Sequence, residues 1–163
     1  MSTSSTFHGR TRRGHSWPPG TVNALAVLLG LLVIGALQGG IAMVTNPIDP
    51  LGMSPDYLHR TPVGDYFWPG MFLIGIATAS AITVPGLVSD WEWRWASPIE
   101  SAIGHRWPWL ASIAIGFVLL AFELIELVMV PFHPIMHPLL IAWSIAIVML
   151  PLTRSGRAHL SVR

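Results

Sequence analysis

The chain contains no cysteine and no lysine, and charged residues of either sign are scarce. Without cysteine it forms neither a disulfide framework nor a thiolate metal site. Charged residues make up 10% of the 163 residues, against about 25% in an ordinary soluble domain. A net charge of +1 offers no basic stripe for nucleic acid. Because 52% of the residues are hydrophobic, disorder is excluded too, which leaves a polytopic membrane protein.

Four apolar runs have the length, or nearly the length, that a membrane crossing needs. About 20 helical residues span the hydrocarbon core, and lipid favours helices because they satisfy their own backbone groups. The sequence therefore predicts an all-α polytopic membrane protein with four transmembrane helices. The predicted spans are residues 22–44, 67–88, 109–130 and 136–153. The fourth is the weakest, because its uninterrupted apolar part runs only from Leu139 to Leu152.

The few positive charges predict the orientation of the spans. Arginines precede the first span, separate the second from the third, and follow the fourth: Arg10, Arg12, Arg13, Arg94, Arg106, Arg154, Arg157 and Arg163. Arg60 alone lies between the first two spans, in a segment that carries aspartates instead. The positive-inside rule therefore places both termini in the cytoplasm of a plasma (inner) membrane protein. Residues 45–66 become the outer loop and residues 89–108 the inner loop.

The segments outside the spans are short. Residues 1–21 and 154–163 are polar and Arg-containing, so we expect cytoplasmic tails without a fold of their own. In the outer loop, Ser54–Pro55 has the pattern of an N-cap followed by proline at the first helical position. This pattern predicts one or two helical turns that end by Arg60.

The inner loop contains an alternation of tryptophan and charge that has two interpretations. The motif consists of Asp90, Trp91, Glu92, Trp93, Arg94 and Trp95. Tryptophan is favoured at the depth of lipid headgroups, so the motif fits an interfacial belt. Tryptophan and arginine are also favoured anchors in protein interfaces, so Trp91, Trp93, Arg94 and Trp95 equally fit a docking site for a partner.

A capping box follows the tryptophan motif. Ser97 is followed three residues later by Glu100, and this spacing allows the two residues to cap the same helix start. We therefore expect a short helix from Pro98 to about Arg106 before the third span begins.

Glu123 and Glu126 are the strongest candidates for chemistry. They lie three residues apart in the third span, so they share a helix face. An ionised group near the bilayer centre costs roughly 2.5–3.5 kcal/mol on insertion scales. The two carboxyl groups are therefore expected to face protein or a wet cavity, not lipid.

Counting residues from the outer ends of the spans suggests neighbours for this pair. Gln38, Trp143 and Ser144 fall at a similar depth, and we predict a polar cluster of Glu123, Glu126, Gln38, Trp143 and Ser144. Two histidines, His133 and His137, lie just above it as possible outer ligands.

Several functions fit such a cluster. Carboxylate and imidazole suit Zn, Mn or Fe, yet the Glu-x-x-His pairs of di-iron bundles are missing from the sequence. Haem ligation by the outer histidines and proton-linked transport are two further hypotheses. For a transporter, however, four spans without an internal repeat are few. A structural or partner-docking network is the remaining reading. We expect no bound metal or other cofactor and no enzyme activity, because the sequence contains no nucleophile motif, phosphate loop or cysteine pair.

Small residues in the first two spans predict close helix packing. Gly35 and Gly39 are four residues apart in the first span, and Gly75 and Ala79 repeat that spacing in the second. Such spacing lets two helices approach each other closely. The predicted contact is between spans one and two, or with another subunit.

Residues 39–70 resemble a pattern found in small, uncharacterised four-span bacterial membrane proteins. The shared elements are Gly39–Gly40–Ile41, Asn46–Pro47, Leu51–Gly52–Met53 and the run from Pro62 to Gly70, in which Val63 replaces the usual phenylalanine. The lysine-free composition is similar to that of proteins from GC-rich actinobacterial genomes. This resemblance implies four spans and no known activity.

Small four-span proteins of this kind are sometimes accessory subunits of larger envelope complexes, such as lipid-import transporters and respiratory supercomplexes. We therefore expect a non-catalytic accessory or stabilising subunit of a membrane complex, a transporter among the candidates. Its partners would be membrane lipid and other membrane proteins or further copies of the chain, and not nucleic acid. The alternative is a small ligand-, metal- or proton-handling membrane protein that uses Glu123 and Glu126.

Overall fold

The computed structural model describes residues 20–58, 62–89, 93, 96–129 and 134–161. Within these ranges the ordered elements are helices, and one isolated antiparallel bridge joins His105 to Ser161. The elements are α1 (Gly20–Thr45), η1 (Pro50–Gly52), η2 (Pro55–Leu58), α2 (Phe67–Val88), α3 (Ser97–Ile103), α4 (Trp107–Met129), α5 (Met136–Leu152) and α6 (Arg154–Leu160).

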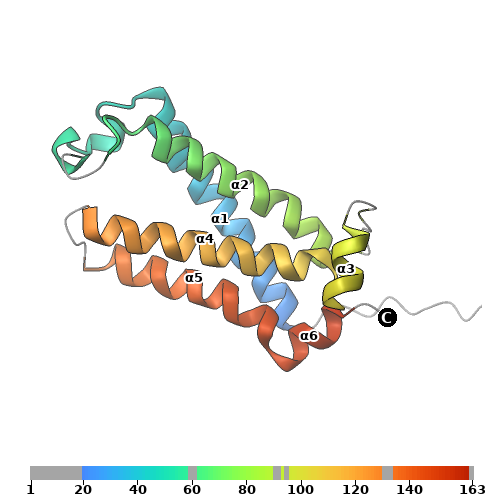
Figure 1. Cartoon of the computed structure of the whole chain (residues 1–163). Coiled ribbons are helices and arrows are strands. Elements are labelled where there is room, and N and C mark those ends of the chain that lie inside the picture. The colour runs from blue at the N-terminus through green and yellow to red at the C-terminus, as the bar shows by residue number, and fades with distance from the viewer. Residues whose placement is uncertain (1–19, 59–61, 90–92, 94–95, 130–133, 162–163) are drawn as a thin grey trace, which may run out of the picture.

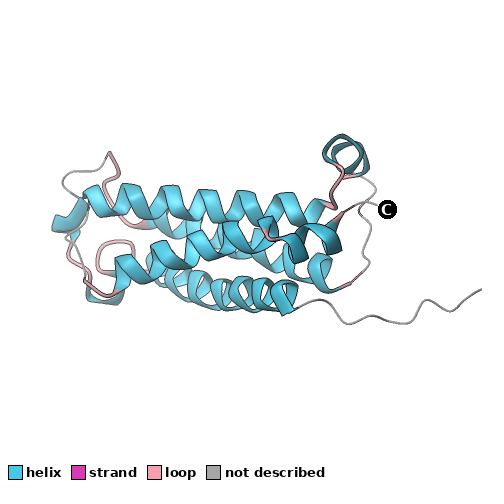
Figure 2. Ribbon diagram, turned by 90° about the horizontal axis from the view of Figure 1, so that it is seen from below, coloured by secondary structure: helices cyan, strands magenta, loops and turns pink. Residues whose placement is uncertain are grey.

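The long helices run side by side along the length of the molecule (Figure 2). Figure 1 shows α3, α6 and the start of α1 at one end, which we call the α3/α6 end, and η1 and η2 at the opposite end. Successive long helices alternate in direction. α1 packs most extensively against α2, and α4 against α5.

Three helices, α1, α2 and α4, are long and apolar enough to cross a membrane. A fourth crossing is present if α5 and α6, which meet at a bend of 60°, count as one broken span. The helix ends coincide with the predicted spans to within about half a turn. Large apolar side chains, such as Ile34, Phe72, Val128 and Leu139, face outward from every long helix, as a lipid environment requires.

The tight contact between α1 and α2 is made by Gly40 and Gly70. A Cβ atom built on Gly70 would lie 2.7 Å from the Met43 Cβ and 2.9 Å from the Gly40 carbonyl oxygen. The predicted contact between the two helices is therefore present, but the prediction for Gly35 and Gly75 was wrong within the chain. A Cβ on either would meet nothing within 4 Å, and one on Gly39 would be in ordinary contact with Leu73. Because neither glycine carries a side chain, the backbones of the two helices come together at this point.

Hydrogen bonds within the connection between α1 and α2 hold its described parts together. The Asp56 amide donates to the Ser54 Oγ at 3.2 Å, at the start of the 3₁₀ turn that the Ser54–Pro55 pattern predicts. Tyr66 is buried, and its hydroxyl donates to the Ser54 carbonyl at 3.0 Å. The Tyr66 amide donates to the Pro47 carbonyl at 2.9 Å, which closes the loop across its base.

Glu100 caps the start of α4 and not that of α3. Its carboxylate accepts a hydrogen bond of 2.7 Å from the Trp107 amide, while the start of α3 has no side-chain cap. The predicted capping box with Ser97 was therefore wrong. α3 ends at Gly104, whose φ of 71° turns the chain back, and this turn brings Glu100 beneath the first amide of α4.

Glu100→Ala is expected to lower the unfolding free energy by about 1 kcal/mol, because the Trp107 amide loses its acceptor. Unfolding by SDS in mild-detergent micelles, followed by circular dichroism, measures the change. Ser101→Ala is the matched control, since the Ser101 hydroxyl bonds only within α3. Equal stability of the two variants would argue against the cap.

Residues 154–160 form a packed helix, so the prediction of a simple tail was wrong for this segment. The Thr153 Oγ1 accepts a hydrogen bond from the Gly156 amide at 3.1 Å and caps α6. Leu160 is fully buried in the main apolar core, and its carbonyl accepts from the Arg106 amide at 2.7 Å. The polar composition of residues 154–163 predicted a tail, but the Thr153 cap and the burial of Leu160 hold α6 against the bundle.

Candidate functional site

The ionisable side chains of the four long helices are confined to one place. α1 and α2 contain no acidic, basic or histidine residue. Glu123 and Glu126 are the only such residues of α4, and His137 is the only one of α5. All three lie near the junction of α4 and α5, at the end of the bundle opposite the α3/α6 end.

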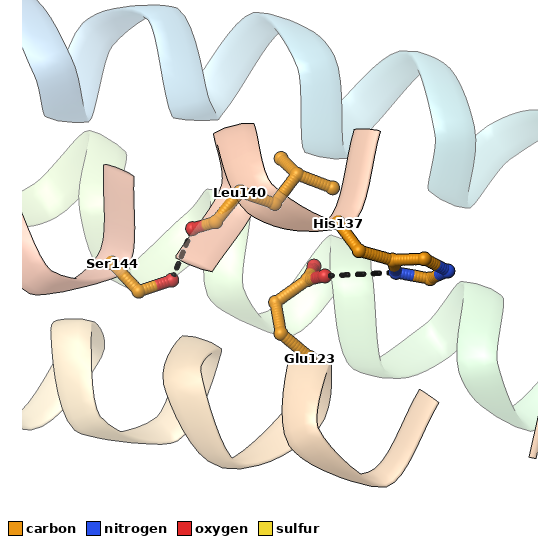
Figure 3. A network of polar contacts seen from close by, with 4 residues as sticks. All are labelled: Glu123, His137, Leu140 and Ser144. Atoms are coloured by element: carbon orange, nitrogen blue, oxygen red, sulfur yellow. Dashed lines mark hydrogen bonds and ion pairs between the residues drawn. The ribbon is translucent and has the colours of Figure 1, made fainter. Parts of the chain in front are cut away.

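Glu123 and His137 point toward one another from neighbouring helices (Figure 3). The carboxyl side chain is 3% exposed and the imidazole 6% exposed, so the pair lies inside the protein. Glu123 Oε2 lies 3.9 Å from His137 Nδ1, which is an ion-pair distance and too long for a hydrogen bond. Glu123 Oε2 accepts no hydrogen bond from any residue that the structure describes.

Glu126 lies about one helical turn beyond Glu123 on α4. It is partly buried and within electrostatic range of His137. It also acts on Tyr66: burial raises the pKa of the Tyr66 hydroxyl above its ordinary value, with smaller contributions from Tyr57 and Glu126.

Trp143 and Ser144 lie deeper on α5 and differ in their bonding. The Ser144 hydroxyl donates to the Leu140 carbonyl of its own helix at 2.7 Å (Figure 3), so its proton is committed there and not to Glu123. The Trp143 Nε1 is buried and donates to no residue in the described part of the chain. The Ser80 hydroxyl of α2 is a second such buried group, which the sequence did not single out.

Gln38 does not join the cluster. It is exposed on α1, and it makes no hydrogen bond with a described residue. The core face of α1 includes Ala36 and Gly40, and a position two residues from Ala36 lies about 200° further round the helix. Depth along the membrane was therefore a poor guide, because it ignores the direction in which each side chain points.

Of the other residues that the sequence suggested for a site, the structure describes only some. Trp91, Arg94, Trp95 and His133 lie outside the described residues. Trp93 is exposed, and its ring meets that of Trp107 edge-on with centroids 5.3 Å apart.

The described residues place a carboxyl group and an imidazole side by side inside the protein. Among the described residues, no group of three histidines, cysteines or acidic residues is arranged to hold a metal ion. A buried carboxyl group beside an imidazole is instead a pair of proton acceptors in a site with little water.

No protein-family model, curated protein or solved structure matches the chain.

Proposed function

We propose that the chain is a non-catalytic accessory or stabilising subunit of a larger membrane complex of the cell envelope. A transporter, such as a lipid-import system, is the kind of complex it would serve. In this proposal α1, α2, α4 and the bent α5–α6 unit make four crossings of the plasma membrane, with both termini in the cytoplasm. The short connections between the helices support a role carried out inside the membrane.

The observation that carries this proposal is the outward face of α1. Gln38 lies about 10 Å from the outer end of this helix at 1.5 Å per residue, exposed among apolar side chains such as Ile34 and Ile41. An amide group that faces lipid leaves its donors and acceptor unsatisfied, which is costly in hydrocarbon. A partner helix with a polar group at this depth would satisfy it.

Gly35 supplies the room for such a partner. It lies on the same face as Gln38, one turn away, and the space where its Cβ would stand is open. A glycine beside a hydrogen-bonding side chain allows a second helix to approach closely and to pair with the amide. The face therefore suits a transmembrane helix of another protein that presents a small residue and a polar residue at matching depth.

The charge pattern supports the proposed orientation. Arg106, Arg154 and Arg157 all lie at the α3/α6 end, which the positive-inside rule assigns to the cytoplasm. Trp109 lies partly exposed at the same end, where interfacial tryptophan is favoured. Its Nε1 donates to the Pro151 carbonyl at 3.0 Å, so this residue also ties α4 to α5.

Gln38→Leu is expected to release the partner while the chain stays folded, because the substitution removes the amide and leaves the core face of α1 unchanged. Extraction in a gentle detergent, affinity capture and mass spectrometry measure the ratio of partner to chain. We expect that ratio to fall at least tenfold, which corresponds to about 1.4 kcal/mol.

Thr78→Leu is the matched control, because Thr78 is an exposed polar residue of α2 whose hydroxyl bonds to the Ile74 carbonyl of its own helix. This variant should retain the partner. Wild-type chain that migrates alone or as a homodimer, with no co-purifying membrane protein, would refute the proposed function.

A further inference from the structure

We propose that Glu123 and His137 form a proton-binding site. Glu123 holds a proton that it shares with His137, and the resulting hydrogen bond joins the outer ends of α4 and α5. The inference concerns the purified chain itself, so it stands or falls separately from the proposed partner. It also differs from the Glu123–Glu126 pair that the sequence favoured, because the second member comes from another helix.

The first argument is the balance of charge. The long helices carry two carboxyl groups and one imidazole, and no arginine or lysine. With both carboxyl groups ionised, at least one negative charge remains uncompensated even if the imidazole is protonated. Burial makes such a charge costly, and Glu123 is the more buried of the two carboxyl groups, so Glu123 takes up a proton instead.

The second argument is the geometry of the pair. Glu123 Oε2 is buried, accepts no hydrogen bond from a described residue, and is directed at His137 Nδ1 from 3.9 Å. When a proton from water binds to Oε2, the carboxylic O–H becomes a donor to the neutral Nδ1. The two atoms then need to approach by about 1 Å to reach hydrogen-bond distance, and this approach draws α4 and α5 together.

Among the described residues, the long helices around the pair supply no arginine or lysine to compensate a negative charge. α1 and α2, which pack against α5 and α4, contribute no ionisable side chain. Glu126 on α4 adds negative charge, and the Tyr66 hydroxyl donates to the Ser54 carbonyl. Glu126 is only partly buried, so it is the more accessible of the two carboxyl groups.

Infrared difference spectroscopy of the purified full-length chain tests the proposal through the carbonyl band of a protonated carboxyl group. At neutral pH we expect such a band in the wild-type chain, and we expect its loss at alkaline pH. Glu123→Gln should remove the band. Glu100→Gln, which changes a carboxyl group at the opposite end of α4, is the control and should retain it. His137→Asn should shift the band, because the acceptor of the O–H changes.

Each other outcome counts against the proposal. A wild-type chain without a protonated-carboxyl band at neutral pH overturns it, whatever the variants do, so the test survives a variant that fails to fold. If the band persists in Glu123→Gln and is lost in Glu126→Gln, Glu126 carries the proton and the proposal is wrong. A band unchanged by His137→Asn shows that the proton is not shared. Circular dichroism establishes that each variant retains its helix content.

Discussion

Leu160→Ala is expected to lower the unfolding free energy by about 2–5 kcal/mol, the usual cost of truncating a buried leucine. This side chain is fully buried in the same apolar core as Leu25 of α1 and Ile115 of α4. It anchors α6, whose backbone also bonds to the Arg106 amide. A substitution only a few residues from the C-terminus would therefore weaken the packing of helices distant from it in sequence.

SDS unfolding in mild-detergent micelles, monitored by circular dichroism, measures this effect. Leu124→Ala is the control, because Leu124 faces outward from α4 and half of it is exposed. It should change the unfolding free energy by less than about 0.5 kcal/mol. If both variants have the same unfolding free energy as the wild-type chain, the packing of α6 does not contribute to the stability of the fold.

Gly70→Ala is expected to destabilise the protein by about 1–3 kcal/mol, since overpacking forces neighbouring groups apart. The added methyl group would press on the Met43 Cβ and the Gly40 carbonyl oxygen, at 2.7 and 2.9 Å. Neither atom belongs to the far end of a flexible side chain. The backbones of α1 and α2 would have to separate along the most extensive helix contact in the molecule.

Gly75→Ala is the control, and its expected effect on stability has the opposite sign. It lies little more than one turn further along α2, and its new methyl group would meet nothing within 4 Å. Because alanine favours helix over glycine by about 1 kcal/mol, this variant should be as stable as the wild-type chain or more so. If Gly70→Ala and Gly75→Ala lowered the unfolding free energy equally, the helices would not cross at Gly40 and Gly70.

The positions of the long helices could be predicted because hydropathy and length depend on sequence alone. The Ser54–Pro55 turn could be predicted for a similar reason, since an N-cap and a proline act within a few residues. Which glycines make a contact could not be predicted. Gly35 and Gly40 both lie in α1, but only the rotation of the helix, set by all of its partners together, directs Gly40 toward Gly70.

The candidate site was predicted in part. Burial of Glu123 follows from the cost of a carboxyl group in lipid, and His137 was recognised as a residue near the outer end of the bundle. Their pairing depends on how α5 docks on α4, which residue counting does not provide. Glu100 shows the same limit: its spacing from Ser97 is local, but the amide it caps belongs to the next helix, beyond a turn at Gly104.

Cross-linking inside intact membranes tests the central claim, that the outward face of α1 binds another membrane protein. A photoreactive residue placed at Gln38 should form one discrete cross-link to a single membrane protein. The same residue at Val128, which faces outward from α4, should not form this product. The account predicts that specific product at Gln38. Attachment at Gln38 to lipid alone, or to a second copy of the chain, would contradict it.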